Sequence, residues 1–242
     1  MVLPIAEVSA NLRQSGEQAL EDAKNLLSDE RITEVIGQSM PIPYLTRIAE
    51  DKHAPLIAVG SGQYDESLPW KLGSVARALS YSSQQSLLIA KEPAISTGPL
   101  YAIFATDHSD YAKAALRKLI EWAPQGLMRI DVLTVYDFND ATLNRLQRES
   151  HFDFDAENLV REKAMEETRA AAAELKAICP DTNALVRKGP VNECIRDEMA
   201  STGAELLIMG AQGHGFYERL FIGSVSLYQT LATPHSVLLI RR

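Results

Sequence analysis

Leu206-Leu-Ile-Met-Gly210-Ala-Gln-Gly213-His-Gly-Phe-Tyr-Glu-Arg-Leu-Phe-Ile-Gly223-Ser-Val225 is the stretch of the chain that decides the fold. Its four leading residues are apolar, which is typical of a buried parallel strand, and a helix is predicted after Gly223. The glycines between them are spaced G-x2-G-x9-G, and a serine follows the third. Glycine lets a backbone approach an anion closely, and the amides that begin a helix bind phosphate without a lysine. The stretch therefore predicts a strand, a phosphate-binding loop and a helix in succession.

Strands and helices alternate around this loop, from about residue 98 to residue 242. The predicted strands are compact apolar runs, and the predicted helices carry apolar residues at spacings of three and four. We predict strands at 100–106, 130–136, 184–186, 206–209 and 237–240, and helices after Ser109 and at 156–178, 191–201 and 225–231. This alternation implies an α/β fold, an open and doubly wound parallel sheet with helices on both faces. Such sheets bind ligands beyond the carboxyl ends of their strands.

The first half of the chain repeats the later part of this pattern at a constant offset of 150 residues. Residues 56–60 match 206–210, residues 73–75 match 223–225, and residues 86–89 match 236–239. We therefore predict two tandem copies, residues 1–95 and 98–242, with a linker at 91–98. The first copy is predicted to be incomplete and to lack its first strand–helix pair, with Val2–Ala6 as a candidate remnant of its second strand. Its predicted elements are helices at 12–27 and 43–52 and after Gly73, and strands at 32–36, 56–59 and 87–90.

Composition excludes several classes of protein. The chain has 242 residues, of which 46% are hydrophobic and 23% charged, with a net charge of −8. Because that charge repels a phosphate backbone, we expect no nucleic-acid partner. The longest apolar runs are too short for a membrane helix, no amino-terminal signal is visible, and the two cysteines form no ligand-spaced pattern. We expect a cytoplasmic protein with no metal site, whose histidines lie at the solvated surface.

The loop and its surroundings resemble the universal stress protein family. The pattern G-x2-G-x9-G-S, preceded by Met209, is similar to that family's ATP-binding loop. Residues 234–241 resemble its final strand, and Ala105-Thr106-Asp107 resembles its first-strand signature, whose aspartate lies beside the adenine and ribose. Val135 matches the strand position whose backbone meets the base. The resemblance covers residues 98–242, while His108 stands where many members have glycine, and Ala211 and Gln212 replace a more polar pair.

This resemblance implies an adenine-nucleotide α-hydrolase-like sheet with strand order 3-2-1-4-5 and an adenine-nucleotide ligand. That ligand is ATP, or ADP or AMP, and Mg²⁺ can accompany it. The residues expected to bind it are Ala105, Thr106, Asp107, Val135, Met209, Gly210, Gln212, Gly213, Gly223, Ser224 and Val225. The first copy keeps Gly60 and Gly73-Ser74, but Gln63 replaces its middle glycine and its aspartate-bearing strand is missing. We expect that copy to be empty.

Three functions remain open on this reading. The first is an ATP-binding stress-response or signalling module that changes what it docks to, with an unknown protein partner. The second is a slow ATPase, for which only Gln212, His214 and Arg219 offer groups in the loop, so we expect at most weak hydrolysis and assign no catalytic residue. The third is a nucleotide-free interaction scaffold of the same fold. The chain carries no P-loop, no dinucleotide fingerprint and no nucleophile elbow.

We also expect a homodimer. A missing central strand would leave 32–36 and 56–59 with unpaired backbone groups, which is costly in a buried sheet. The family's tendency to pair final strands implies that 87–90 joins 237–240.

Overall fold

The computed structural model describes residues 5–27, 31–37, 39–62, 72–91, 98–137, 156–213 and 222–242. The chain divides into two compact units, Met1–Leu45 and Thr46–Arg242. The smaller unit contains helix α1 (Ile5–Leu27), and helix α2 (Pro41–Asp51) begins in it and ends in the larger unit. Two predictions for this region are wrong. Residues 32–36 form no strand, and Ile5 and Ala6 belong to α1 and to no remnant strand, while residues 2–4 lie outside the described part.

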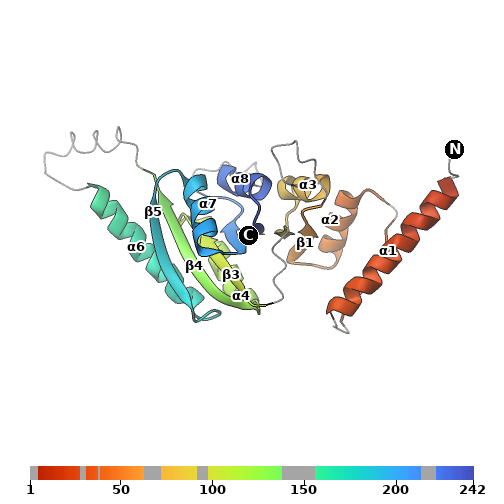
Figure 1. Ribbon diagram of the computed structural model, residues 1–242, viewed down its shortest axis with the longest axis horizontal. Helices are drawn as coiled ribbons and strands as arrows, with labels where there is room; N and C mark the ends of the chain where they lie inside the picture. The colour runs from red at the N-terminus through yellow and green to blue at the C-terminus, as the bar shows by residue number, and fades with distance from the viewer. Residues whose placement is uncertain are drawn as a thin grey trace. The chain divides into compact units, whose positions relative to one another are not determined.

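The larger unit is built on one sheet of seven described strands in the order β1-β2-β7-β6-β3-β4-β5. Figure 1 shows β3, β4 and β5 side by side. Every neighbouring pair is parallel except β2 and β7, which are antiparallel. Within residues 98–242 the order is therefore 3-2-1-4-5, as predicted, and the predicted pairing of the two final strands is confirmed within one chain. The strands are β1 (Leu56–Gly60), β2 (Ser86–Ala90), β3 (Leu100–Ala105), β4 (Leu127–Tyr136), β5 (Thr182–Lys188), β6 (Leu206–Gly210) and β7 (Ser236–Ile240).

Helices cover both faces of the sheet, which confirms the α/β prediction. Helices α4 (Asp110–Trp122) and α6 (Ala156–Leu175) lie on one face, where their alanines and leucines pack on alternate residues of β3, β4 and β6. Helix α8 (Ser224–Ala232) contacts both α3 (Ser74–Ser82) and α7 (Val191–Thr202), and these three helices cover the opposite face (Figure 1). Residues of one strand point alternately to the two faces, and helices cover both. Strands β3, β6 and β7 are therefore buried along nearly their whole length, which matches their continuous apolar sequences.

Helix α4 begins and ends where its sequence indicates. Ser109 is its N-cap, and the Ser109 hydroxyl accepts a hydrogen bond from the Ala112 amide at 3.1 Å. Ala123 adopts the left-handed conformation with φ 43°, and Pro124 follows. The cap fixes the turn between β3 and α4, which carries Thr106 and Asp107.

The junction of β2 and β7 is held by two buried cations at the same 150-residue offset. Lys91 follows β2, and its Nζ donates to the carbonyl oxygens of Thr230 and Thr233 at the end of α8, at 2.6 and 2.8 Å. Arg241 follows β7 and donates 2.6 Å to the Ser80 carbonyl in the last turn of α3. Each cation therefore satisfies carbonyls at the end of the helix in the other half, where the helix dipole favours positive charge.

The offset of 150 residues extends to nearly every described element of the first half. Helices α1, α2 and α3 begin within a residue of the positions 150 before α6, α7 and α8, and β1 and β2 match β6 and β7. The exception is residues 32–36, the counterpart of β5. Strand β5 pairs with β4, and no described residue of the first half supplies a counterpart of β4. Because β2 joins the sheet of β7, the compact units divide at residue 45 and not at the repeat boundary near 97.

Candidate functional site

A cavity of about 270 Å³ opens beyond the carboxyl ends of β3, β4 and β6. It lies where the strand order reverses between β3 and β6, which is the position at which open α/β sheets bind ligands. The structure brings every predicted ligand-binding residue to this cavity. These are Ala105, Thr106, Asp107, Val135, Met209, Gly210, Gln212, Gly213, Gly223, Ser224 and Val225.

One wall of the cavity is formed by Asp107, which follows β3. Its Oδ1 accepts hydrogen bonds from the Ser109 amide at 3.1 Å and from the Ser109 hydroxyl at 2.7 Å. Its Oδ2 faces the glycine loop so closely that a Cβ added to Gly213 would lie 2.4 Å from it. Gly213 has no positive φ, so the constraint on this position is the nearby Asp107 carboxylate and not a left-handed backbone. Asp107 thus links the end of β3 to the loop after β6.

The opposite wall is the start of α8, whose N-cap is Gly223. The Gly223 amide donates 2.7 Å to the Ala211 carbonyl, and the Ser226 hydroxyl donates 2.9 Å to the Gly210 carbonyl. These bonds hold the two described ends of the glycine loop together. No side chain caps α8, so the amides of its first turn face the cavity as donors, and the helix dipole adds partial positive charge. Ser224 is the first residue of the helix and not its cap, because the cap position is Gly223.

The floor of the cavity is apolar and includes residues that sequence reasoning missed. Leu133 lies two residues before Val135 on the same face of β4, a spacing that could have identified it. Val191 and Ile195 come from the first turns of α7, four residues apart on one helix face, and their position over the cavity depends on the packing of α7. The missed lining residues are Ala112, Leu133, Val191, Ile195 and Ser226.

The arrangement suits a ligand with an apolar planar part and an anionic part. Asp107 is the one charged residue among the described residues that line the cavity, and a carboxylate there can accept hydrogen bonds from ribose hydroxyls. Donors for phosphate come from backbone amides and from Ser224. Gly213 has no side chain to obstruct a ligand, and the first-turn amides of α8 have no side-chain cap. Both features fit a nucleotide whose base lies on the apolar floor and whose phosphates contact the loop.

His108 differs from the surface residue that the sequence suggested. Its φ is 58°, a conformation that glycine adopts readily. The half-buried ring places Nε2 2.8 Å from the Thr134 hydroxyl and 3.3 Å from the Thr168 hydroxyl, so it links the β3–α4 turn to α6. His235 is half-buried as well, and burial, followed by the nearby charge of Lys91, lowers its pKa to about 4. His53 is exposed as expected, whereas His151 and His214 lie outside the described residues.

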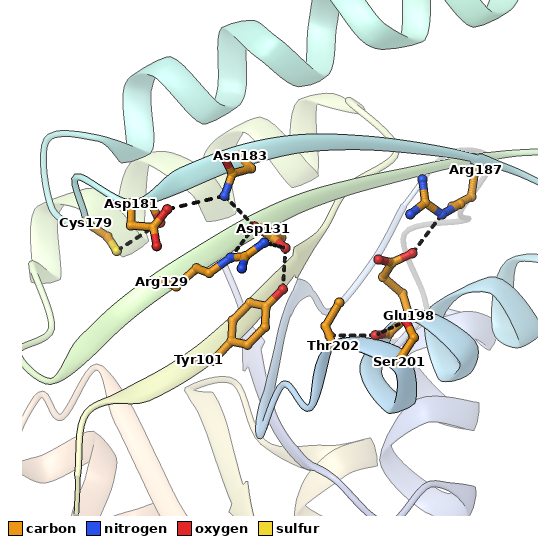
Figure 2. A network of polar contacts seen from close by, with 10 residues as sticks. All are labelled: Tyr101, Arg129, Asp131, Cys179, Asp181, Asn183, Arg187, Glu198, Ser201 and Thr202. Carbon is orange, nitrogen blue, oxygen red and sulfur yellow. Dashed lines mark hydrogen bonds and ion pairs between the residues drawn. The ribbon is translucent and has the colours of Figure 1, made fainter.

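A second polar cluster lies at the other end of the strands, among the amino-terminal ends of β3, β4 and β5 (Figure 2). Asp131 is fully buried and receives hydrogen bonds from Tyr101, Arg129 and Asn183. Burial alone would raise the pKa of Asp131, but these three donors outweigh it and lower the pKa.

Burial and the neighbouring carboxylate raise the pKa of Tyr101 to about 12. Neither group of this pair is poised for proton transfer near neutral pH, so the cluster acts as a structural ion pair. Nearby in Figure 2, Arg187 pairs with the buried Glu198 at 2.7 Å and ties β5 to α7.

Metal and membrane features are lacking in the part of the chain that the structure describes. No group of three metal-ligating side chains gathers among those residues. None of the described helices combines the length and the apolar character that crossing a membrane requires. His214 and Arg219, two of the loop residues considered for hydrolysis, lie outside the described ranges.

Comparison with known proteins agrees with the fold. The model of the universal stress protein family matches residues 102–241. A search of curated proteins finds no match. A universal stress protein from Archaeoglobus fulgidus is 17% identical with a TM-score of 0.61, over 99% of this chain and 81% of its own. A functionally unknown protein from Pseudomonas aeruginosa is 13% identical with a TM-score of 0.62, over 93% of this chain and 77% of its own. These similarities show the fold, and the family model covers more than half of the chain, so the chain belongs to the universal stress protein family.

Proposed function

We propose that this chain is an adenine-nucleotide-binding module of stress response or signalling, with ATP, ADP or AMP as its ligand. The observation that carries the proposal is the convergence of three separate segments on one cavity. The turn after β3 supplies Asp107, the end of β4 supplies Val135, and the loop after β6 supplies Gly210, Gly213 and Gly223.

Each part of a nucleotide has a matching part of the cavity. The apolar floor of β4 and α7 suits the adenine ring, and Asp107 suits the ribose hydroxyls. The loop amides and the start of α8 suit the phosphates. Mg²⁺, when it accompanies the nucleotide, would be held by phosphate oxygens and water, since Asp107 is the one lining carboxylate among the described residues.

Binding is favoured over catalysis. Hydrolysis of a nucleotide needs a group that orients water and positive charge at the transferred phosphate. The described lining residues include no lysine, arginine or histidine. We therefore expect turnover far below about 1 s⁻¹, a rate that ordinary enzymes reach. A phosphate-release assay with ATP and Mg²⁺ tests this. Phosphate release at that rate would show that the protein is an ATPase.

We further propose that residues 1–95, the first copy of the repeat, are an incomplete unit that binds no nucleotide. They contain counterparts of β6, α8 and β7. Their described part contains no counterpart of β3, which leads to Asp107, or of β4, which contains Val135. A homodimer in which this first half forms the contact, with the cavity of residues 98–242 left accessible, completes the proposal.

Calorimetric titration of the full chain with ATP, ADP and AMP tests the ligand. We expect about one site per chain, because one complete cavity is present. Mass spectrometry of nucleotide extracted from the purified chain identifies the resident ligand. Two equivalent sites would contradict the empty first half, and no binding of any of the three would leave the third function, a nucleotide-free scaffold.

A further inference from the structure

Helix α1 has lost the face that its counterpart α6 buries. In α6, Ala164, Thr168, Ala171, Ala172 and Leu175 lie against the sheet and are each at most 8% exposed. The residues 150 positions earlier in α1 are Gln14, Gln18, Glu21, Asp22 and Asn25, and all of them are exposed. Polar and charged side chains on that face cannot replace the packing of α6 on a sheet. Helix α1 therefore does not use the docking mode of α6.

The apolar residues of α1 lie on the opposite side of the helix. At 100° per residue, they occupy one arc centred about 180° from Gln14 and Asn25. Leu12, Leu26 and Leu27 of this arc are 69%, 85% and 67% exposed. The α1 stripe consists of Leu12, Gly16, Ala19, Leu20, Ala23, Leu26 and Leu27. An apolar stripe along a helix of this length marks a helix-packing surface.

We propose that the α1 stripe packs against the α1 stripe of a second copy of this chain, as an antiparallel pair whose two-fold axis passes near Gly16. This proposal names the surface of the homodimer proposed above. An isologous interface must be self-complementary about its axis. Leu12 and Leu20 lie four residues to either side of Gly16, and Ser9 and Ala23 lie seven to either side. Leucine therefore meets leucine and small residue meets small residue, while Gly16 lets the two backbones approach at the axis.

Charge supports the same arrangement. Arg13 and Glu17 lie beside the stripe and form an ion pair of 2.9 Å within one helix. In the antiparallel pair, Arg13 lies within two residues, about 3 Å along the axis, of the partner's Glu17. Along one edge of the interface the two glutamates then lie between the two arginines, so each glutamate has an arginine of the partner beside it. The acidic outer face of α1, with Glu21 and Asp22, disfavours the anionic membrane surface that attracts basic amphipathic helices.

The size of the stripe sets the strength that we expect. A helix of 23 residues is about 35 Å long. One face of a single helix of this length buries less surface than the roughly 800 Å² per partner of a standard stable interface. The pair is therefore expected to be a reversible dimer with a dissociation constant in the range of about 1 to 100 μM.

Sedimentation equilibrium of the full chain with two charge-matched variants tests the surface. Leu12→Glu places a carboxylate in the stripe, and Gln18→Glu adds the same charge to the opposite, exposed face. We expect Leu12→Glu to raise the dimer dissociation constant about tenfold or more, because the carboxylate would be buried without a partner. Gln18→Glu should leave it within about twofold, since surface changes of this kind have small effects. Equal dimerisation of the two variants, or a monomeric parent at about 100 μM, overturns the proposal.

Cysteine cross-linking tests the antiparallel register. In a background with Cys194→Ser, which leaves only the buried Cys179, Gly16→Cys should form an intermolecular disulfide across the axis. Leu26 lies ten residues from the axis, so Leu26→Cys residues would be about 30 Å apart and should not cross-link. Efficient cross-linking of Leu26→Cys would show a parallel pair and refute the axis at Gly16. Nucleotide titration of Leu12→Glu should match the parent, which separates this result from a failure of nucleotide binding.

Discussion

Replacement of Gly213 by alanine should weaken nucleotide binding through Asp107, without a change of fold. The added Cβ would lie 2.4 Å from Asp107 Oδ2, whereas ordinary van der Waals contact begins near 3.4 Å. Either the added Cβ or the Asp107 carboxylate must therefore move by about 1 Å, and a shift of this size is enough to lose existing van der Waals contacts. The Asp107 carboxylate is anchored by two hydrogen bonds from Ser109, at 3.1 and 2.7 Å.

The expected loss follows from the hydrogen bonds that Asp107 is proposed to accept from the ribose hydroxyls. A hydrogen bond to a charged group is worth about 1.5–3 kcal/mol when buried, and Asp107 is exposed, so about 1 kcal/mol each is appropriate. Loss of two such bonds by the displaced carboxylate weakens binding by about 2 kcal/mol, which is about a 30-fold rise in the dissociation constant. Gly213→Val should lose more. The fold should remain, because Gly213 has no positive φ and alanine can adopt its backbone.

Gly60→Ala is the matched glycine control outside the cavity. The nearest atom to its added Cβ would be the Gly62 amide nitrogen at 4.0 Å, and Gly60 has no positive φ. Isothermal titration with ATP, together with melting temperatures, should show loss of affinity for Gly213→Ala and affinity within about threefold of the parent for Gly60→Ala. Parent-like binding by Gly213→Ala would refute the role of the Asp107 contact. An equal loss in both variants would show a general effect of the substitution and not one of this contact.

Two further predictions concern stability. Asp131→Asn should lower the free energy of unfolding at pH 7 by about 2 kcal/mol, because buried Asp131 loses its ion pair with Arg129. Folding lowers the pKa of Asp131, so its stabilisation is fully present above its unfolded pKa near 4 and is lost as pH falls through the lower folded value. Urea unfolding of parent and variant should therefore begin to converge below about pH 4, and a difference that stays constant with pH contradicts this. Lys91→Met should lower the free energy of unfolding by about 3 kcal/mol, because the carbonyls of Thr230 and Thr233 lose a buried cationic donor. As a control, Lys176→Met on the exposed surface should change the free energy of unfolding by less than about 0.5 kcal/mol in the same assay.

Much of the larger unit could be predicted from local sequence. The apolar runs 100–105 and 206–210 are strands because each is long enough for one strand and too short for a typical buried helix. Ser109 and Pro124 mark the two ends of α4 by capping and by the missing amide of proline. The glycine spacing, together with the family resemblance, placed the candidate site, since residues after parallel strands meet at one edge of a sheet.

Tertiary contacts decided the rest. Residues 32–36 have the apolar character of their counterpart β5, but a strand is stabilised by the backbone of a neighbour, and no described counterpart of β4 is present. Val191 and Ile195 line the cavity because α7 packs over β4, a contact between residues about 60 apart in sequence. His108 finds its hydrogen-bond partners on β4 and α6, and Lys91 finds its acceptors on α8. Sequence periodicity thus determined which segments are strands and helices and which edge of the sheet holds the candidate site, because those properties depend on neighbours in the chain. Which strands find partners, and which polar groups satisfy one another, was decided by packing between distant segments.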